Sequence, residues 1–361
     1  MIPPSPPPPT RDNLLKEWAG TPVNALVSLV SATLAVLVVW ALLDWAVLSA
    51  VSPLRQMEDC TGATGACWRF YVEKSRFMLF GTYPFAEHWR PALVCAALLA
   101  LSVAVGLRLT GRLRGLGPAT LVTMWCAVIP LSFLLMSGGF AGLAPVDMSR
   151  WNGMPVLLIL SVIAIALAFP LGVVLAVLRH QTRWPVLRRA AIVYIEGMRG
   201  FPMVTVLFVG VFVLPLTLPP DTRISPVIAT LIALVFFHAS YFAEDVRGGM
   251  QSLHVGQQEA AASLGLSWLQ SMRFILLPQA LTRSLPALVN SVIGAYKDTS
   301  LVVVLGIHDL TSTARMAFSE PGWGQFALEA YAFVGIWFLL SCAFLSWVGR
   351  ELHRSEGAKG R

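Results

Sequence analysis

Long apolar runs separated by short polar loops make up most of this chain. A helix needs roughly 20 mostly apolar residues to cross the hydrocarbon core of a bilayer. Closed β-barrels would instead show short segments of alternating hydrophobic and polar residues, and no such segments occur in the sequence. The pattern therefore predicts an all-α integral membrane protein with eight spans, at about 24–51, 91–107, 117–136, 153–178, 190–214, 226–243, 284–305 and 326–348.

Composition supports the membrane class. Of the 361 residues, 56% are hydrophobic and only 12% are charged, and the mean hydropathy is +0.70. The basic residues predict the orientation, because cytosolic loops carry an excess of Lys and Arg. The loops after the third, fifth and seventh spans carry few basic residues: Arg150, Arg223 and Arg315. The loops after the second and fourth spans and the C-terminal tail carry many more: Arg108, Arg112, Arg114, Arg179, Arg183, Arg188, Arg189, Arg350, Arg354, Lys359 and Arg361. Both termini are therefore predicted to be cytosolic.

The chain shows no clear internal repeat, but its motifs gather in the second part. Residues 1–23 are rich in proline and predict a disordered cytosolic tail. They lack the positively charged region followed by an apolar region that is found in a cleaved signal peptide. Residues 24–152 then form an N-terminal three-helix extension with a periplasmic loop. Residues 153–350 form a five-helix core with a cytosolic segment at 245–283, and 351–361 form a second tail.

The segment 259–278 lies on the predicted cytosolic side and has a helix–turn–helix pattern. Three successive alanines favour helix, and their small side chains let a partner approach closely. Gly265 suits the left-handed conformation that ends a helix. Ser267 and Gln270 then form a capping box that opens a second helix, which Pro278 is expected to help terminate. The pattern predicts a knob suited to a groove on a partner, and the alternative is an ordinary amphipathic loop.

Two of the five cysteines, Cys60 and Cys67, lie on the predicted outward side in the run C-T-G-A-T-G-A-C-W. The glycines between them allow the tight closure that a disulfide requires, and an oxidising periplasm permits it. We therefore hypothesise a disulfide. A metal site is less favoured, because no histidine flanks the pair.

Ionisable residues within the spans are candidates for a transport route, because they usually face the interior of a helix bundle. Lys297 and Asp298 are predicted near the middle of the seventh span, with Asn290 on the same helical face as Lys297. The alternative is a structural ion pair or a subunit contact.

Two further positions are candidates for the same route. His238 lies on one face of the sixth span, and a satisfied polar contact with a partner is the alternative. Arg199 and Pro202 lie near the cytosolic end of the fifth span, where a proline-interrupted helix can expose backbone carbonyls. Helix packing or gating explains these two residues equally well.

Motifs for catalysis are absent from the sequence. There is no G-x4-G-K-[ST] nucleotide-binding loop, no H-E-x-x-H and no tight cluster of His, Cys and Asp. No catalytic residue, metal ligand, cofactor or nucleic-acid partner is therefore predicted in this chain, and the energy source must lie on another subunit or in an ion gradient.

Several motifs resemble those of binding-protein-dependent ABC importer permeases. The family signature E-A-A-x3-G-x9-I-x-L-P matches Glu259, Ala260, Ala261, Gly265, Ile275, Leu277 and Pro278. The run Y-I-E-G-M-R-G-F-P-M at 194–203 is similar to a segment of polar amino acid permeases, with Phe201 in place of the usual Thr. The runs at 240–266 and K-D-T-S-L at 297–301 are also similar to that family. The disulfide-loop sequence and the extra N-terminal spans resemble the M-type permease of general L-amino acid transporters.

This resemblance implies a type I ABC importer fold and import of L-amino acids across the bacterial inner membrane by alternating access. It also implies a related Q-type permease as partner in a heterodimer, two ATPase subunits that carry ATP and Mg, and a periplasmic amino acid binding protein. The signature residues would couple this chain to the ATPases. The alternatives are an ion-gradient-driven secondary amino acid transporter, which would need no cytosolic knob, and a membrane-embedded enzyme, for which no converging reactive residues are found.

Overall fold

The computed structural model describes residues 20–359 apart from 114, 182, 220, 221 and 223. The described chain is helical, and its only β features are two isolated bridges, Val51–Cys67 and Gly153–Asp309. Most of the predicted tail at 1–23 lies outside the described residues, as do Arg114, Arg223 and Arg361. The chain divides into two compact units, 1–74 and 75–361. The predicted boundary near residue 152 stays a prediction.

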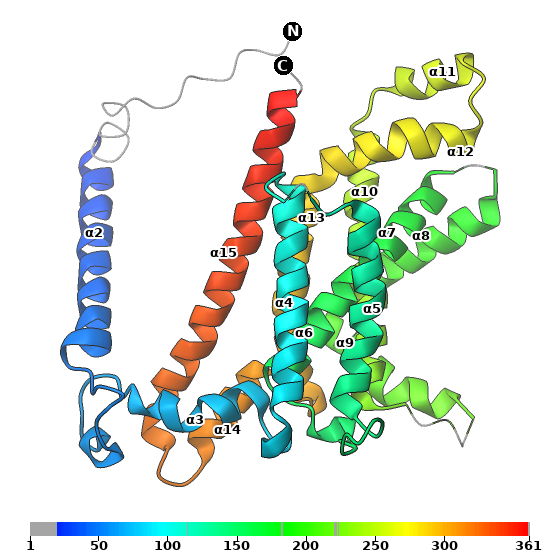
Figure 1. Ribbon diagram of the computed structural model, residues 1–361. Coiled ribbons are helices and arrows are strands. Elements are labelled where there is room, and N and C mark those ends of the chain that lie inside the picture. Colours follow the sequence, from blue (N-terminus) through cyan, green and yellow to red (C-terminus); the bar gives the residue numbers. More distant parts are fainter. Residues whose placement is uncertain (1–19, 114, 182, 220–221, 223, 360–361) are drawn as a thin grey trace. The chain divides into compact units, whose positions relative to one another are not determined.

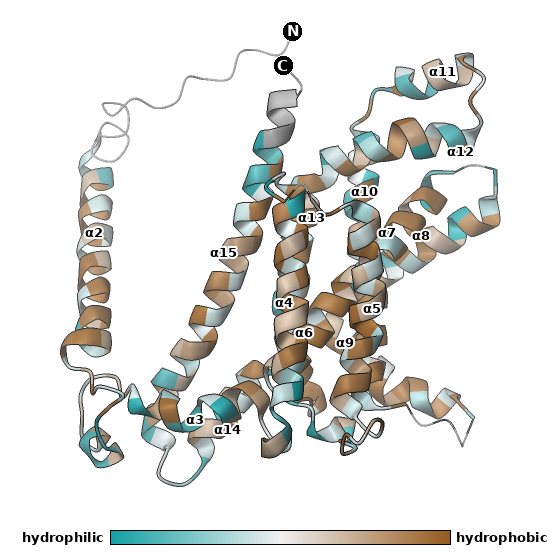
Figure 2. Cartoon of the chain, in the orientation of Figure 1, coloured by the Kyte–Doolittle hydropathy of each residue, from teal (hydrophilic) through white to brown (hydrophobic). Residues whose placement is uncertain are grey.

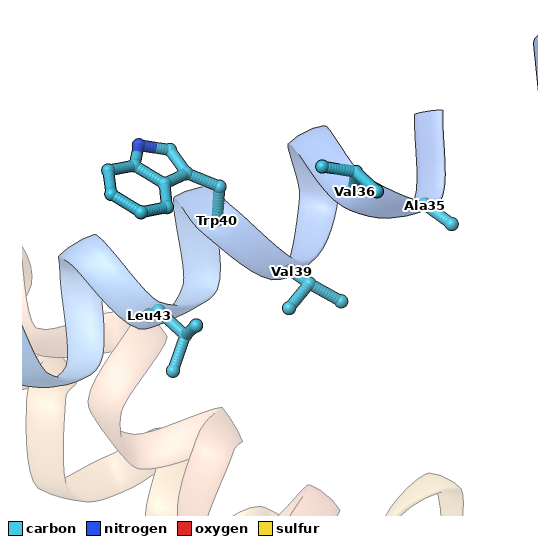
Figure 3. Close-up of a pocket in the computed structure, with 5 residues that line it drawn as sticks. All are labelled: Ala35, Val36, Val39, Trp40 and Leu43. Carbon is cyan, nitrogen blue, oxygen red and sulfur yellow. The ribbon is translucent and has the colours of Figure 1, made fainter. Parts of the chain in front are cut away.

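The first unit is dominated by α2 (Pro22–Leu43), a helix without a buried residue. It begins at an N-cap in which the Thr21 hydroxyl accepts from the Asn24 amide at 3.2 Å, and it ends in a π-turn, η1 (Asp44–Leu48). Its apolar surface includes a shallow hollow (Figure 3) whose lining residues are Ala35, Val36, Val39, Trp40 and Leu43. An exposed apolar helix of this length is suited to contact lipid.

A compact loop follows α2 in the first unit. Asp44, the one acid of the first span, lies at the helix end and accepts from the Ser49 hydroxyl at 3.0 Å. A disulfide joins Cys60 to Cys67, the pair expected from the sequence, with their Cα atoms 5.7 Å apart. The Trp68 indole donates to the Ala46 carbonyl at 3.0 Å, which ties the loop back to the end of the span.

The second unit begins within α3 (Arg69–Phe80) and contains the remaining helices. The main ones are α4 (Trp89–Leu109), α5 (Pro118–Ser137), α6 (Met154–Leu158), α7 (Ala164–His180), α8 (Pro185–Gly200), α9 (Met203–Phe208), α10 (Pro226–Gln251), α11 (Val255–Ser263), α12 (Trp268–Ser271), α13 (Leu277–Asp298), α14 (Leu310–Ser319) and α15 (Ala327–Lys359). The α11 and α12 helices project from the end of this unit opposite to α14 (Figure 1). Hydrophobic residues cover the lengths of α4 and α5 (Figure 2).

Seven helices of the described chain are long and apolar enough to cross a membrane, or eight when a bent pair counts as one span. The bent pair is α8 and α9, which meet at an angle of 109°. The predicted fifth span at 190–214 is therefore this bent pair, interrupted at Pro202 as its proline indicated. The chain is extended at Phe201 (φ −91°, ψ 142°) because a residue before proline is disfavoured in the α region.

The centre of the second unit is the close packing of α7 against α10. A Cβ added to Gly172 would lie 2.6 Å from the Phe242 Cβ and 2.8 Å from the Ala239 carbonyl oxygen. Ala168 and Ala176 lie one turn on either side of Gly172 and are fully buried. Small residues at this spacing let two helix backbones approach closely, which is how helices pack tightly inside a membrane.

Candidate functional site

The helix α11 ends in a hydrogen-bonded turn centred on Gly265. The Leu266 amide donates to the Ala261 carbonyl at 3.2 Å, and the Gly265 amide donates to the Ala262 carbonyl at 3.0 Å. Gly265 has φ +72°, and no atom lies within 4 Å of the position of an added Cβ. This pattern is a Schellman motif, and the predicted left-handed glycine is confirmed.

The second helix, α12, begins with the predicted capping box. The Ser267 hydroxyl accepts from the Gln270 amide at 3.3 Å, and the Gln270 side chain accepts from the Ser267 amide at 2.8 Å. The prediction that Pro278 ends this helix is wrong. The chain continues from α12 through a π-turn, η8 (Met272–Leu276), directly into α13. Such a local change of hydrogen-bond register accommodates the missing proline N–H.

The exposed residues of this segment, defined here as the α11–α12 surface, combine large apolar side chains with polar ones and include one carboxylate. Ala261 is buried, whereas Ala260 and Glu259 are exposed. Glu259 forms no ion pair within the described part of the chain. Of the other signature residues, Ile275 and Leu277 are half-buried and Pro278 is exposed. The surface also presents Val255, Leu264, Leu269 and Phe274, whose exposed fractions are 73%, 78%, 65% and 66%.

The base of the segment is packed tightly against the spans. A Cβ added to Gly249, near the end of α10, would lie 2.2 Å from the Ala280 carbonyl oxygen on α13. Met250, Met272 and Leu276 belong to the same buried cluster as Ala280. The segment is therefore held to α10 and α13 by close packing.

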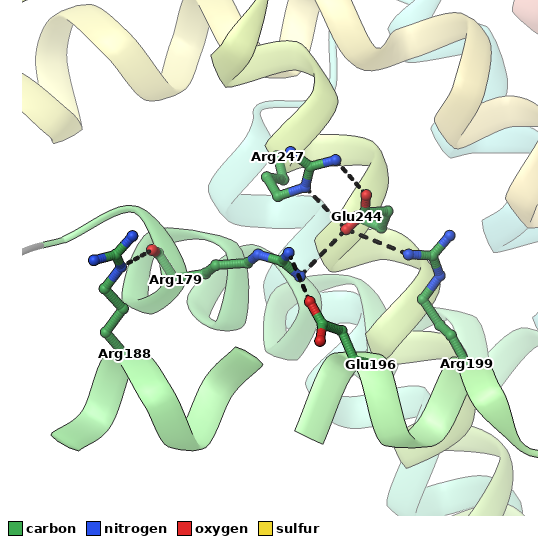
Figure 4. Close-up of polar contacts among 6 residues, drawn as sticks. All are labelled: Arg179, Arg188, Glu196, Arg199, Glu244 and Arg247. Carbon is green, nitrogen blue, oxygen red and sulfur yellow. Dashed lines mark hydrogen bonds and ion pairs between the residues drawn. The ribbon is translucent and has the colours of Figure 1, made fainter. Parts of the chain in front are cut away.

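A network of charged residues joins α7, α8 and α10 (Figure 4). The Glu244 carboxylate on α10 pairs with Arg247 on the same helix, with Arg199 on α8 at 3.4 Å and with Arg179 on α7 at 3.5 Å. Arg179 also pairs with Glu196 on α8 at 3.1 Å. One carboxylate therefore fixes the ends of three helices relative to each other.

The residues predicted for a transport route do not share one surface. Lys297 and Asn290 are exposed on α13, whereas His238 is only 4% exposed and its ring packs against Phe237. Asp298 is half-buried, and Arg199 and Pro202 are exposed at the bend between α8 and α9.

Lys297 and Asp298 lie within the seventh candidate span, at a change of helix type. They are the last two residues of α13, and the 3₁₀ turn η9 (Thr299–Leu305) follows. The helix starts earlier than its apolar window, because the amphipathic stretch after Trp268 is helical as well.

Sequence reasoning missed the central role of Glu244. The signal was the i, i+3 spacing of Glu244 and Arg247 on α10 and of Glu196 and Arg199 on α8, which places opposite charges on one helical face. Neither pair indicates by itself that the two helices meet.

Comparison with known proteins agrees with this architecture. Residues 168–355 match the family described as "Binding-protein-dependent transport system inner membrane component". The chain is 35% identical over 345 residues to the inner membrane amino-acid ABC transporter permease protein YhdY of Escherichia coli K12, covering 95% of this chain and 91% of that protein. It is 30% identical to the glutamate/glutamine/aspartate/asparagine transport system permease protein BztC of Rhodobacter capsulatus, covering 91% of this chain and 89% of that protein.

Shorter relatives match only part of the chain. The glutamine transport system permease protein GlnP of Escherichia coli K12 is 33% identical and covers 64% of this chain and 96% of its own length. A solved structure titled "Crystal structure of an amino acid ABC transporter with histidines" is 28% identical, covers 56% of this chain and 92% of that chain, and has a TM-score of 0.49.

These findings define an ABC importer permease with an all-helical transmembrane fold. The chain belongs to the family of binding-protein-dependent transport system inner membrane components, and it is a multi-pass protein of the inner membrane.

Proposed function

We propose that this chain is the M-type permease subunit of an importer that moves L-amino acids across the inner membrane. The relatives named for amino acids and the disulfide-loop sequence support this substrate class. In this proposal the chain pairs with a related Q-type permease. Two ATPase subunits, which hold the ATP and Mg, bind on the cytosolic side, and a periplasmic binding protein delivers the substrate.

The α11–α12 surface is the observation that carries the proposal. Its exposed Leu264, Leu269 and Phe274 offer an apolar contact. The Glu259 carboxylate, which has no ion-pair partner among the described residues, offers a charge for a basic group of the ATPase. A helix pair that presents exposed apolar side chains in this way is suited to dock into a groove on another protein.

The proposed mechanism is alternating access driven by closure of the two ATPases. Closure pushes on the α11–α12 surface, and the packing of Gly249 against Ala280 transmits the push to α10 and α13. The Glu244 network makes α7 and α8 follow α10. Docking of the loaded binding protein and closure of the ATPases must favour the same outward-open state, because a ligand shifts an equilibrium only through its differential affinity for the two states.

The decisive experiment reconstitutes the permease pair and the ATPases into liposomes and measures uptake of labelled amino acids. We expect uptake that needs ATP inside and loaded binding protein outside, and that vanadate abolishes. Uptake that persists without ATP and collapses with an ionophore would instead identify a secondary transporter. Copurification from native membranes, with partner chains identified by mass, tests the subunit composition separately.

A further inference from the structure

A basic pocket lies beside the charged network, at the end of the spans that carries α11. Its volume is about 280 Å³, and its lining includes Arg179 and His180 from the end of α7, Arg188 and Ile192 from α8, and Arg247 from the end of α10. The last lining residue, Gln251, ends α10 and lies four positions before α11 begins.

The positive charge around this pocket exceeds the negative charge. Arg179, Arg188, Arg199 and Arg247 carry four positive charges, whereas the carboxyl groups of Glu196, Glu244 and Asp245 carry at most three negative charges. Arg188 has no carboxylate partner among the described residues, and its Nε donates to the Arg179 carbonyl at 3.3 Å. The Nη1 of Arg179 is buried, forms no hydrogen bond among the described residues and lies 3.5 Å from Oε2 of Glu244. An anion in the pocket would therefore give Arg188 a charged partner.

The surroundings of the pocket favour an anion with an apolar tail. Helix α8 presents Val186, Leu187 and Val193 on its surface, with exposed fractions of 77%, 48% and 72%, and Trp184 precedes it at 58%. A helix with basic residues and exposed apolar side chains lies in the headgroup region of a membrane. Basic pockets between spans on the cytosolic side bind the phosphates of anionic lipids.

We propose that this pocket binds the phosphate group of an anionic lipid headgroup, with Arg188 as the principal contact and Arg179 and Arg247 beside it. The bound phosphate balances the excess charge where α7, α8 and α10 meet. The lipid thereby stabilises the cluster of helix ends next to the α11–α12 surface. This proposal does not depend on which substrate the complex transports.

The test uses the assembled transporter complex and native mass spectrometry, with phosphatidylglycerol as probe and phosphatidylcholine as the neutral comparison. The variants are Arg188→Gln, Arg188→Lys and the matched control Arg189→Gln, which changes an exposed arginine one position further along α8 that does not line the pocket. We expect phosphatidylglycerol to bind about fivefold more weakly to Arg188→Gln, because one basic residue near a headgroup contributes about that factor. Arg188→Lys and Arg189→Gln should bind it like the wild type.

Competition with inorganic phosphate separates the two sources of the ligand. If millimolar phosphate displaces phosphatidylglycerol from the wild type but not from Arg188→Gln, the pocket also takes free phosphate, and the phosphate site stands. If phosphate has no effect, the site is specific for the lipid. Equal binding of phosphatidylglycerol to Arg188→Gln and Arg189→Gln, or equal binding of both lipids to the wild type, overturns the proposal. Uptake by the same variants is a separate measurement that tests the transport function.

Discussion

Asp309 shows how a single buried carboxyl makes the stability of this protein depend on pH. It caps α14 from a fully buried position, and it accepts from the amide and the hydroxyl of Ser312 at 2.9 and 2.8 Å. Burial raises the pKa of the Asp309 carboxyl above its usual range, and the Ser312 hydrogen bonds only partly oppose this shift. The folded protein therefore binds this proton more tightly than the unfolded chain does, so the contribution of Asp309 to stability falls as pH rises above the unfolded pKa of about 4.

Replacing Asp309 with Asn should remove this pH dependence. Asparagine is as good an N-cap as aspartate, so the cap survives while the buried charge disappears. We expect Asp309→Asn to be at least as stable as the wild type at pH 8, with the difference shrinking at pH 5. Thermal denaturation of the purified complex at both pH values is the measurement. Parallel stability profiles for the two proteins would contradict the prediction.

The disulfide between Cys60 and Cys67 predicts a simple count of thiols. The chain has five cysteines, and three of them, Cys95, Cys126 and Cys342, are free in the structure. Denaturing the membranes without reductant and alkylating should therefore add three labels, since 5 − 2 = 3. Reduction before alkylation should raise the number to five, which controls for accessibility. Five labels without reductant would show that both thiols are free.

At the scale of elements, the turn between α11 and α12 depends on one backbone conformation. Gly265 has positive φ and open space around it, so a side chain there meets no clash and is opposed by backbone strain alone. Gly265→Val should cost at least about 1 kcal/mol and tilt the Ala260 face relative to α12. We expect poor assembly, or ATP hydrolysis without stimulation by binding protein. Glu259→Ala keeps the turn and should assemble but transport slowly.

Proteoliposomes allow both variants to be measured for ATPase rate, with and without loaded binding protein, and for uptake. Gly256→Val is a useful control, because Gly256 lies in the same segment, has no positive φ and also has open space around it. It should be affected less than Gly265→Val. Wild-type stimulation and uptake in both Gly265→Val and Glu259→Ala would mean that this segment does not couple the chain to the ATPases.

The packing of α7 on α10 predicts opposite outcomes for two glycines. An alanine at Gly172 forces its Cβ against Phe242 and the Ala239 backbone, and overpacking of this kind costs about 1–3 kcal/mol. An alanine at Gly197 on α8 meets nothing within 4 Å and should stabilise that helix by about 0.5–1 kcal/mol. Thermal denaturation of the two variants should therefore move in opposite directions. A neutral Gly172→Ala would show that α7 and α10 are less closely packed than the structure shows.

Local chemistry explains which elements could be predicted from the sequence. The Schellman glycine and the Ser267–Gln270 cap are set by residues within a few positions of each other, so the sequence alone indicates them. The proline at position 202 also indicates a bend, but the sequence does not indicate the 109° angle between α8 and α9. Whether Pro278 ends a helix depends on the π-turn before it. Glu244 meets Arg179 and Arg199 only because three helices fold together. Such tertiary relations have no signature in local spacing.

At the scale of the whole molecule, the second unit leaves polar groups exposed on a span. Lys297 and Asn290 both lie on exposed positions of α13, although ionised side chains in spans normally face protein or water rather than lipid. The proposed partner permease would cover this face. The residues would then line either a route between the two permeases or a contact between them, and the two roles have different consequences.

Lys297→Met and Asp298→Asn distinguish these roles. If the pair lines the route, each change should lower uptake several-fold while the complex still assembles and its ATPase stays coupled to the binding protein. If the pair is a subunit contact, removal of one charge leaves the other unpaired in a low-dielectric bundle, and the complex should dissociate more readily. Size-exclusion chromatography of the complex is therefore measured before uptake. Arg283→Met controls for loss of a positive charge, because Arg283 is also exposed and lies about four turns earlier on α13. Normal uptake by an assembled double variant of Lys297 and Asp298 would exclude both residues from the transport route.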